Sequence, residues 1–397
     1  MLVSVVIPTF NSADYLVQAI QSVLAQTYHE FEIIVVDDAS TDNTEELLRP
    51  FADRICYVRQ DRGGPSVARN RGILQARGEL IAFLDADDLW RPTKLARQVE
   101  YLKCHPEACL VYTDFTRGPR PGSNNESRLR DFKTRVAGAE RREAPDSDCS
   151  AGASKAQPRP PFSVDVFHGL LEENFIATPT VMVRRSALAR SGLFDPTLRG
   201  SEDLDLWLRL AGEPGAWHAP RLCEGRAEVA MTPRPSKTQG VPPVSDRRFG
   251  FIDEILVDVR QHEANTSRTV DFIHEQIRAA RIMLARWGDD PAAARLIRRR
   301  LGICSWNLAF AEQTRGRYSQ ARSAYWSSAC HTFAARPTPM SLFLNWKAHE
   351  NLPPFAGAIA RAAFMSLPPS VLSLARQWMR SLGQGPGLKR APLSRRG

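Results

Sequence analysis

Three carboxylates stand within four residues of one another, just after a short apolar run. Asp85, Asp87 and Asp88 follow residues 80–84 (LIAFL). Such a cluster is self-repelling unless a cation or hydrogen bonds offset its charge. Carboxylate oxygens suit Mg²⁺ or Mn²⁺ bound together with a substrate diphosphate. We therefore predict a metal site here, while Asp88 could instead cap a helix that starts near Pro92.

A second acidic pair opens a predicted helix. Glu202 and Asp203 are followed by Leu204, Trp207 and Leu208 at helical spacing. Carboxylates are favoured at a helix N-terminus by the helix dipole, so capping alone would explain the pair. The alternative is a general base at the edge of a cleft. The three apolar side chains favour packing in the core.

Other polar segments follow predicted strands. The turn at residues 8–11 (PTFN) ends the first strand, and Asp37 and Asp38 end the second. A carboxylate at a strand end can bind a nucleobase or ribose, or it can cap the next helix. The glycine-rich segment 63–72, which contains Arg69, fits neither G-x-x-x-x-G-K-[ST] nor a G-x-G-x-x-G after the first strand. This argues against a P-loop NTPase and a dinucleotide oxidoreductase.

Alternating strands and helices must position these residues. The predicted strands span residues 3–7, 32–37, 55–59 and 80–84, and the predicted helices span 13–25, 41–48 and 66–76. This alternation predicts an α/β protein with a mainly parallel sheet flanked by helices. Ligands of such sheets bind at the carboxyl ends of the strands, which is where the acidic residues fall.

The rest of the chain is less regular. Residues 117–161 and 221–248 lack apolar periodicity and are predicted to be irregular insertions. Between and after them we predict a helix at 164–171, strands at 180–183 and 251–259, and helices beyond residue 269. Residues 303–336 resemble one tetratricopeptide-like helical hairpin, but such repeats need about three neighbours, so a plain helical appendix is favoured. The predicted domains are 1–268, a helical extension at 269–380 and a basic flexible tail at 381–397.

Composition excludes several classes. The 397 residues are 43% hydrophobic and 24% charged, which excludes wholesale disorder. No run of about 18 apolar residues occurs, and no basic segment precedes an apolar one at the N-terminus, so the cytosol is the expected compartment. The seven cysteines form no C-x-x-C pair and are expected to be reduced. The net charge of +9 suggests a polyanionic partner without naming it.

These blocks, in this order, resemble the family 2 glycosyltransferases, which have the nucleotide-diphospho-sugar GT-A fold. The resemblance covers about residues 2–220 and resumes at 251–268. It implies a role for each matching residue. The nucleoside would be held by Pro8, Thr9, Asn11 and Asp38, with Arg69 near the base or diphosphate and Asp85 near the ribose. Asp87 would bind the metal, and Asp203 would be the catalytic base. The acceptor or cleft side would include Glu202 and Trp207.

One departure from the family concerns a further metal ligand. The family often follows its Glu-Asp helix closely with a strand that carries Arg-x-His, whose His binds the metal. Nothing similar follows His218 at the expected distance, whereas residues 252–262 look like that strand displaced by an insertion. The resemblance thus implies that His262 is a metal ligand. A structural or solvated histidine is the alternative.

The resemblance implies an inverting glycosyltransferase. It would use Mg²⁺ or Mn²⁺ and move a sugar from a nucleotide diphospho-sugar to a hydroxyl of an acceptor. The acceptor could be lipid-linked, and the reaction would belong to cell-surface polysaccharide or glycolipid assembly. A non-catalytic nucleotide-sugar-binding or scaffold protein is the alternative. Nucleic-acid binding is not expected, because no zinc-finger spacing or basic recognition helix occurs. Apolar residues 355–374 and the basic residues after them predict either peripheral contact with the inner face of the cytoplasmic membrane or a solubilising tail.

Overall fold

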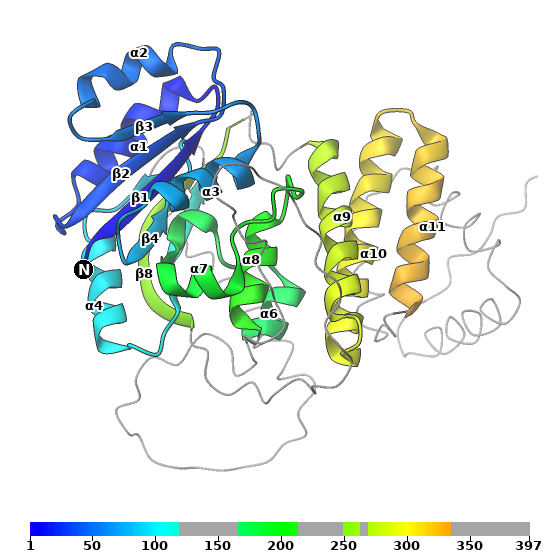
Figure 1. Ribbon diagram of the computed structural model, residues 1–397. Helices are drawn as coiled ribbons and strands as arrows, with labels where there is room; N and C mark the ends of the chain where they lie inside the picture. Colours follow the sequence, from blue (N-terminus) through cyan, green and yellow to red (C-terminus); the bar gives the residue numbers. More distant parts are fainter. Residues whose placement is uncertain (119–165, 213–248, 263–268, 335–397) are drawn as a thin grey trace, which may run out of the picture. The chain divides into compact units, whose positions relative to one another are not determined.

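A computed structural model of the chain describes residues 1–118, 166–212, 249–262 and 269–334 (Figure 1). Nearly all of the two predicted insertions, and the whole predicted tail at 381–397, lie outside these residues. The chain divides into two compact units, Met1–Arg300 and Leu301–Gly397. The predicted domain boundary at residue 268 falls inside the first unit.

One sheet organises the first unit. Its strands are β1 (Val3–Thr9), β2 (Phe31–Asp37), β3 (Cys56–Arg59), β4 (Leu80–Phe83), β5 (Leu89–Trp90), β6 (Leu110–Gly118), β7 (Met182–Arg184) and β8 (Phe249–Arg260). They lie in the order β3-β2-β1-β4-β7-β6-β8-β5. The pairs β2–β3, β1–β2, β1–β4 and β6–β8 are parallel, while β4–β7, β6–β7 and β5–β8 are antiparallel. The sheet is therefore parallel over its first four strands, as predicted, and mixed beyond them.

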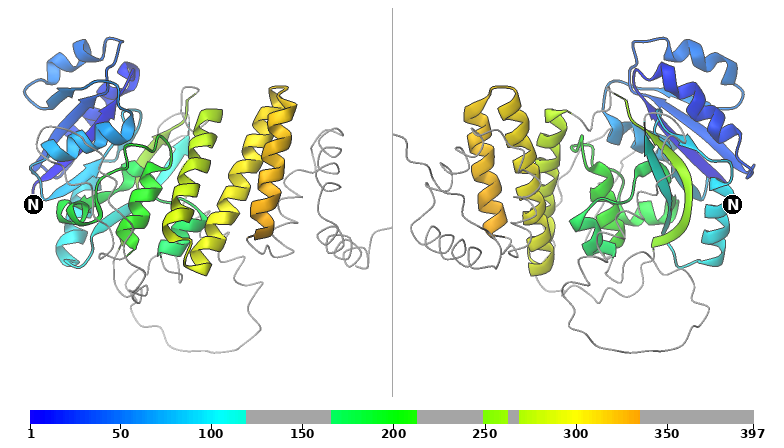
Figure 2. Two further views of the ribbon diagram at one scale, coloured as in Figure 1. Left: turned by 45° about the vertical axis from the view of Figure 1, so that its right-hand side comes forward. Right: turned by 180° about the vertical axis from the view of Figure 1, so that it is seen from behind.

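Helices flank this sheet, which Figure 2 shows from two further directions. They are α1 (Ala13–Leu24), α2 (Thr44–Leu48), α3 (Pro65–Gln75), α4 (Lys94–Cys104), α6 (Val166–Glu172), α7 (Arg185–Ser191) and α8 (Glu202–Ala211). Helix α9 (Val270–Trp287) packs on α8 (Figure 2). The predicted helices at 13–25 and 66–76 are each present within a residue or two, and the helix predicted to open at Glu202 and Asp203 is α8. The α/β class is confirmed.

The core forms where the central strands meet the helices. Strands β1 and β4 are almost wholly buried, because their β-branched and apolar side chains face covered layers on both sides. Helix α3 lies so close to β1 that a Cβ on Gly72 would stand 2.4 Å from a methyl carbon of Val6. This close approach fixes the side of α3 that faces the strand ends.

Two elements differ from the prediction. Residues 110–118 form β6, one of the longer strands, so residues 117 and 118 continue a strand and do not begin an insertion. The predicted strand at 180–183 is divided into a short 3₁₀ helix at Thr178–Thr180 and strand β7.

The second unit contains a helical hairpin. Helix α10 (Pro291–Thr314) crosses the boundary between the units, and α11 (Tyr318–Ala334) follows a turn in which Gly316 has a φ of 74°. Within the unit, the rings of Trp306 and Tyr325 lie 4.8 Å apart, and Ser328 Oγ donates to the carbonyl of Gly302. The C-terminal helical extension is thus confirmed. No helix in the described parts of the chain is long and apolar enough to span a membrane.

Candidate active site

The three clustered carboxylates lie on the loop between β4 and β5, at the carboxyl edge of the parallel strands. Asp88 is buried, and one of its oxygens accepts the backbone N–H of Arg260 at 2.9 Å. Helix α4 begins instead after Thr93, with no side-chain cap. The predicted capping role of Asp88 is therefore wrong, because this carboxylate joins the loop to the end of β8.

A buried arginine connects the two acidic motifs. Arg69 on α3 donates from Nη2 to Asp85 Oδ1 at 2.7 Å and from Nη1 to Glu202 Oε1 at 2.8 Å. Burial lowers the pKa of Arg69, but the two carboxylates more than offset this, so its pKa lies above the ordinary value. The structure thus brings together segments more than a hundred residues apart in sequence.

The N-terminus of α8 is held in place by contacts to α3. Asn70 Nδ2 donates to the carbonyl of Phe194 at 2.8 Å, and Asn70 Oδ1 accepts the backbone N–H of Phe194 at 2.9 Å. Ser66 Oγ donates to the carbonyl of Leu198. Ser201, the residue before the helix, has a φ of 60° and no capping hydrogen bond from its side chain. Contacts from α3 to the segment before α8 therefore help to position the Glu-Asp pair.

Asp203 is half-buried and accepts two hydrogen bonds. The backbone N–H of Leu204 donates to Oδ1 at 2.7 Å, and Asn174 Nδ2 donates to Oδ2 at 3.0 Å. Burial raises the pKa of Asp203 above its usual value, against these two hydrogen bonds, which lower it. Burial also raises the pKa of Glu202, although Arg69 counteracts it. A carboxylate whose pKa is raised toward neutrality is a stronger general base.

The end of β8 brings His262 to the carboxylate cluster. His262 Nε2 lies 3.0 Å from Asp87 Oδ2, and the imidazole ring stacks on Tyr15 of α1 with centroids 4.7 Å apart. Arg260 supports this arrangement, since its Nε donates to the carbonyl of Asp87 and its Nη1 to Gln18 Oε1. The displaced strand therefore places a histidine beside Asp87. His218, the alternative, lies outside the described residues.

The donor set at this point fits a divalent cation that also binds a substrate. Asp87 offers a carboxylate oxygen and His262 an imidazole nitrogen, both suited to Mn²⁺ and usable by Mg²⁺. Burial, and after it the nearby charge of Asp85, raise the pKa of Asp87. Among the residues that the structure describes, no group of three potential metal ligands comes together. The chain would thus supply two ligands and the substrate or water the others.

The predicted nucleoside side lies at the ends of β1 and β2. Asp38 is buried, and its oxygens accept the backbone N–H groups of Gly63 and Gly64 at 2.7 and 2.8 Å and the amide of Gln60 at 2.8 Å. Asp38 thereby shapes the glycine-rich loop before α3. Its backbone N–H also donates to the carbonyl of Thr9, which joins the two strand ends.

Pro8 and Asn11 complete this side. Pro8 lies in β1 beside Val36, and Asn11 follows the strand with a φ of 48°. Asn11 Oδ1 accepts the backbone N–H of Thr41 at 2.8 Å, and its own N–H donates to Ser40 Oγ. These contacts hold the turn after β1 against the loop after β2, so the predicted nucleoside residues lie at adjacent strand ends.

Trp207 does not belong to the candidate site. Its side chain is fully buried and packs against Phe83 and Phe194. The predicted acceptor or cleft role of Trp207 is therefore wrong, since it faces the core through the apolar side of α8. Glu202 faces Arg69 from the same helix.

Sequence reasoning missed three residues at this site. Tyr15 and Arg260 lie in segments that the motifs covered, but their contacts with His262 and with the acidic loop join distant parts of the chain. Asn174 lies in the short connection after α6, where no motif marked it. Only the packing of α6 against α8 places it beside Asp203.

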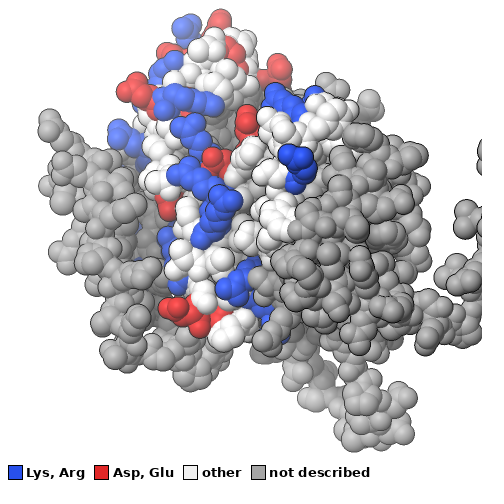
Figure 3. Space-filling view, turned by 90° about the vertical axis from the view of Figure 1, so that its right-hand side faces the viewer, with Lys and Arg blue, Asp and Glu red and all other residues white. Residues whose placement is uncertain are grey.

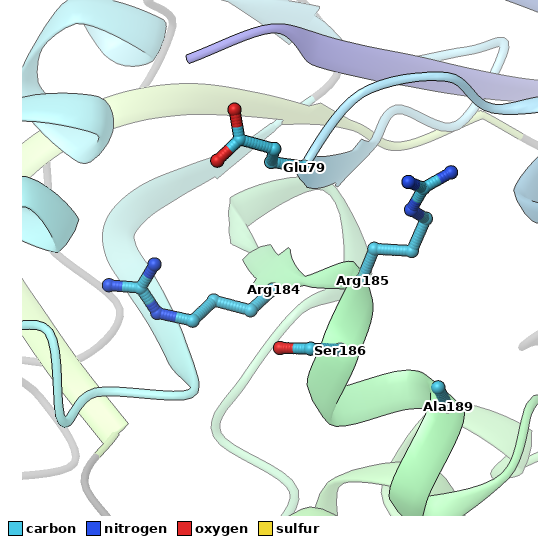
Figure 4. A pocket seen from close by; sticks show the side chains of 5 residues that line it. All are labelled: Glu79, Arg184, Arg185, Ser186 and Ala189. Carbon is cyan, nitrogen blue, oxygen red and sulfur yellow. The ribbon is translucent and has the colours of Figure 1, made fainter.

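Other surface features lie apart from this site. A cavity of about 390 Å³ is lined by Glu79, Arg184, Arg185, Ser186 and Ala189, as Figure 4 shows. It lies beside Glu79, which precedes β4, and so opens at the sheet edge opposite the acidic loop. Arg184 points away to donate to backbone carbonyls at the end of α4. On the face in Figure 3, basic side chains of the described residues are interspersed with acidic and uncharged ones.

Comparison with known proteins agrees with this geometry. Residues 4–190, just under half of the chain, match the family described as glycosyl transferase family 2. The match covers β1 to β7, the acidic loop and Arg69. This segment is therefore similar to the family 2 glycosyltransferases.

Similar proteins are named as glycosyltransferases. The chain is 32% identical over 209 residues to an uncharacterised glycosyltransferase of Rickettsia typhi, which is 52% of this chain and 58% of that protein. It is 38% identical over 104 residues, 26% of this chain, to WfaP of Escherichia coli, a UDP-Glc:alpha-D-GlcNAc-diphosphoundecaprenol beta-1,3-glucosyltransferase, of which it spans 41%. The chain thus spans about half of the length of these relatives.

A solved structure shows the same fold. Residues 1–349 of TarS from S. aureus, in complex with UDP-GlcNAc, align with 18% identity and a TM-score of 0.50 over 83% of this chain and 81% of that one. The GT-A fold predicted from the sequence is confirmed.

Proposed function

We propose that this protein is an inverting glycosyltransferase that moves a sugar from a nucleotide diphospho-sugar to an acceptor hydroxyl. The observation that carries the proposal is the Arg69 bridge. It joins Asp85 of the acidic loop to Glu202 of the Glu-Asp helix and leaves Asp203 beside them. Donor-binding and base residues therefore lie within one connected cluster, as transfer between two bound substrates requires.

The chain's own residues would divide the work. The ends of β1 and β2, with Asn11 and Asp38, would receive the nucleoside, and Asp85 would lie near the ribose. Asp203 would accept the proton from the acceptor hydroxyl at one of its carboxylate oxygens as the acceptor oxygen attacks the anomeric carbon. Arg69 would keep Asp85 and Glu202 in place during this step. Attack from the face opposite the leaving diphosphate would invert the anomeric configuration.

A divalent cation fits the same cluster. Asp87 and His262 would hold Mg²⁺ or Mn²⁺, and the cation would offset the charge that develops on the departing diphosphate. Tyr15 would hold the imidazole of His262 in place, and Arg260 would hold the acidic loop. The donor classes named for the relative from E. coli and the TarS complex, UDP-Glc and UDP-GlcNAc, are the first to test.

The acceptor and its location form a finer part of the proposal. The E. coli relative is named for a diphosphoundecaprenol acceptor, which is a lipid-linked sugar. We propose a lipid-linked acceptor here as well, in cell-surface polysaccharide assembly. Residues 355–397 would then hold the enzyme at the inner face of the cytoplasmic membrane, because the apolar stretch 355–374 and the six basic residues after it favour an anionic surface.

A donor panel tests the proposal. The full chain is incubated with UDP- and GDP-sugars, with Mn²⁺, Mg²⁺ or EDTA, and release of nucleoside diphosphate is measured with and without lipid-linked acceptors. We expect metal-dependent release with at least one donor, and a product whose anomeric configuration is opposite to that of the donor. Binding of a donor without any turnover would favour the non-catalytic alternative, and retention of configuration would refute the inverting mechanism.

A further inference from the structure

Asn174 contacts the candidate base from a separate element. Its Nδ2 donates to Asp203 Oδ2 at 3.0 Å, whereas its Oδ1 is buried and accepts no hydrogen bond from the residues that the structure describes. A buried amide oxygen without a partner reduces stability. Arg69 Nε and Thr9 Oγ1 at the same site are likewise buried without a partner among the described residues. What distinguishes Asn174 Oδ1 is that the other end of the same amide bonds the candidate base.

The backbone on both sides of Asn174 is held in place. The N–H of Glu173 donates to the carbonyl of Gly169 at 3.1 Å and so extends the last turn of α6. On the other side Phe175 is buried, with its ring 6.0 Å from that of Tyr112. The amide therefore stays beside Asp203, and the freedom left to it is rotation about its last side-chain bond.

That rotation matters because an amide has a donor end and an acceptor end. An ionised carboxylate only accepts, so the NH₂ end must face Asp203 before the reaction. Once Asp203 has taken a proton, its Oδ2–H becomes a donor. A half-turn of the amide then presents Oδ1 to it and turns Nδ2 away, so one end of the amide bonds the carboxyl in each protonation state.

We propose that Asn174 is the positioning residue of the base Asp203, bonding the ionised carboxylate through Nδ2 and the protonated carboxyl through Oδ1. This inference rests on the proposed function, in which the proton comes from the acceptor hydroxyl. The acceptor oxygen forms the new bond to the anomeric carbon, and the diphosphate leaves with the electron pair of the bond that breaks. Asn174 keeps the carboxyl oriented through this change.

The charges around Asp203 come from three elements. Glu202 lies next to it on α8, Arg69 faces it from α3, and Asp85 faces it from the loop after β4. Asn174 is uncharged, so replacing it leaves these charges unaltered. Replacing Asn174 removes a hydrogen bond from both forms of the carboxyl, but the bond to the ionised form is the stronger of the two, so the pKa of Asp203 should rise.

The titration of Asp203 tests this directly. The full chain is labelled with carbon-13 at aspartate carboxyl groups, and the Asp203 signal is assigned by its loss in Asp203→Asn. We expect Asn174→Ala, and Asn174→Leu, which better preserves the volume, to move the midpoint upward by about one pH unit. Glu172→Gln, an exposed change at the end of α6, is the matched control and should move it little.

The pH profile of turnover supplies the second readout. The acidic limb of kcat/KM should move upward with the titration midpoint in both Asn174 variants. An unchanged midpoint in both variants, or loss of the fold in both, would overturn the proposal and leave Asn174 a structural residue. The titration needs no donor, so the absence of any transfer activity would refute the proposed function while this measurement still decides the role of Asn174.

Discussion

Replacing Arg69 with methionine probes the contact that joins the two acidic motifs. The change keeps an apolar stem of similar length and removes the guanidinium that bonds Asp85 and Glu202. Removing one partner of a buried ion pair costs about 3–5 kcal/mol, because the other charge is left uncompensated. The Asp85 side chain is 31% exposed and thus partly screened, while that of Glu202 is 12% exposed. We expect a loss of about 3 kcal/mol at neutral pH.

The loss should depend on pH through Glu202. Burial already raises the pKa of this carboxyl in the parent, so the folded protein binds the proton more tightly than the unfolded chain and loses stability as pH rises. Without Arg69, which lowers this pKa, the rise is larger and the loss continues to higher pH. The gap between variant and parent should therefore widen from about pH 5 to about pH 8.

Urea unfolding at the two pH values measures this gap. Arg77→Met is the matched control, since Arg77 bonds Glu32 at 2.8 Å but its side chain is 79% exposed. We expect the control to lose less than about 1 kcal/mol at either pH. A loss for Arg69→Met as small as that of the control, or one that is equal at both pH values, would refute the reasoning.

Three further predictions follow from the same cluster and from the sequence beyond it. Asp203→Asn should lower turnover by about 10²–10⁴-fold with donor affinity nearly unchanged. It should also raise the stability of the folded protein at neutral pH, because it removes a carboxylate whose pKa burial has raised. A collapse of donor affinity would instead make Asp203 a nucleotide contact. His262→Ala should raise the Mn²⁺ concentration needed for activity, whereas His218→Ala should not. The reverse result would show that the displaced strand was assigned to the wrong segment. Removing residues 355–397 should abolish co-sedimentation with anionic liposomes at low salt, and unchanged binding would contradict the membrane role of this segment.

Local patterns were enough to predict the elements that carry the site. The β-branched runs at 3–7 and 32–37 and the apolar run at 80–84 form β1, β2 and β4, because each is bounded by polar turns. Their carboxyl ends share one edge of the sheet, so the position of the acidic loop followed from topology. Strand β6 was missed because its polar end, Thr116–Gly118, runs directly into a segment rich in Arg, Pro and Gly.

Contacts between distant residues could not be predicted in the same way. The sequence allowed Asp88 to cap a helix, and only the pairing of β5 with β8 brings the backbone of Arg260 to it. Trp207 stands beside the acidic pair in sequence, yet the helical repeat turns it toward the core. Asn174 carries no pattern at all. In each case the contact forms through packing between residues far apart in the sequence, and such contacts cannot be predicted from residue types and spacing.

Binding of a nucleoside diphosphate tests the central claim, that the acidic loop is a metal-assisted donor site. Titration calorimetry with UDP or GDP, in Mn²⁺ and again in EDTA, compares the parent with Asp87→Ala. Asp87 stands on a loop, and its side chain is 26% exposed, so the truncation should leave the fold intact. The account predicts binding to the parent that EDTA abolishes and that Asp87→Ala loses in Mn²⁺. Equal affinity in parent and variant, with and without EDTA, would contradict it.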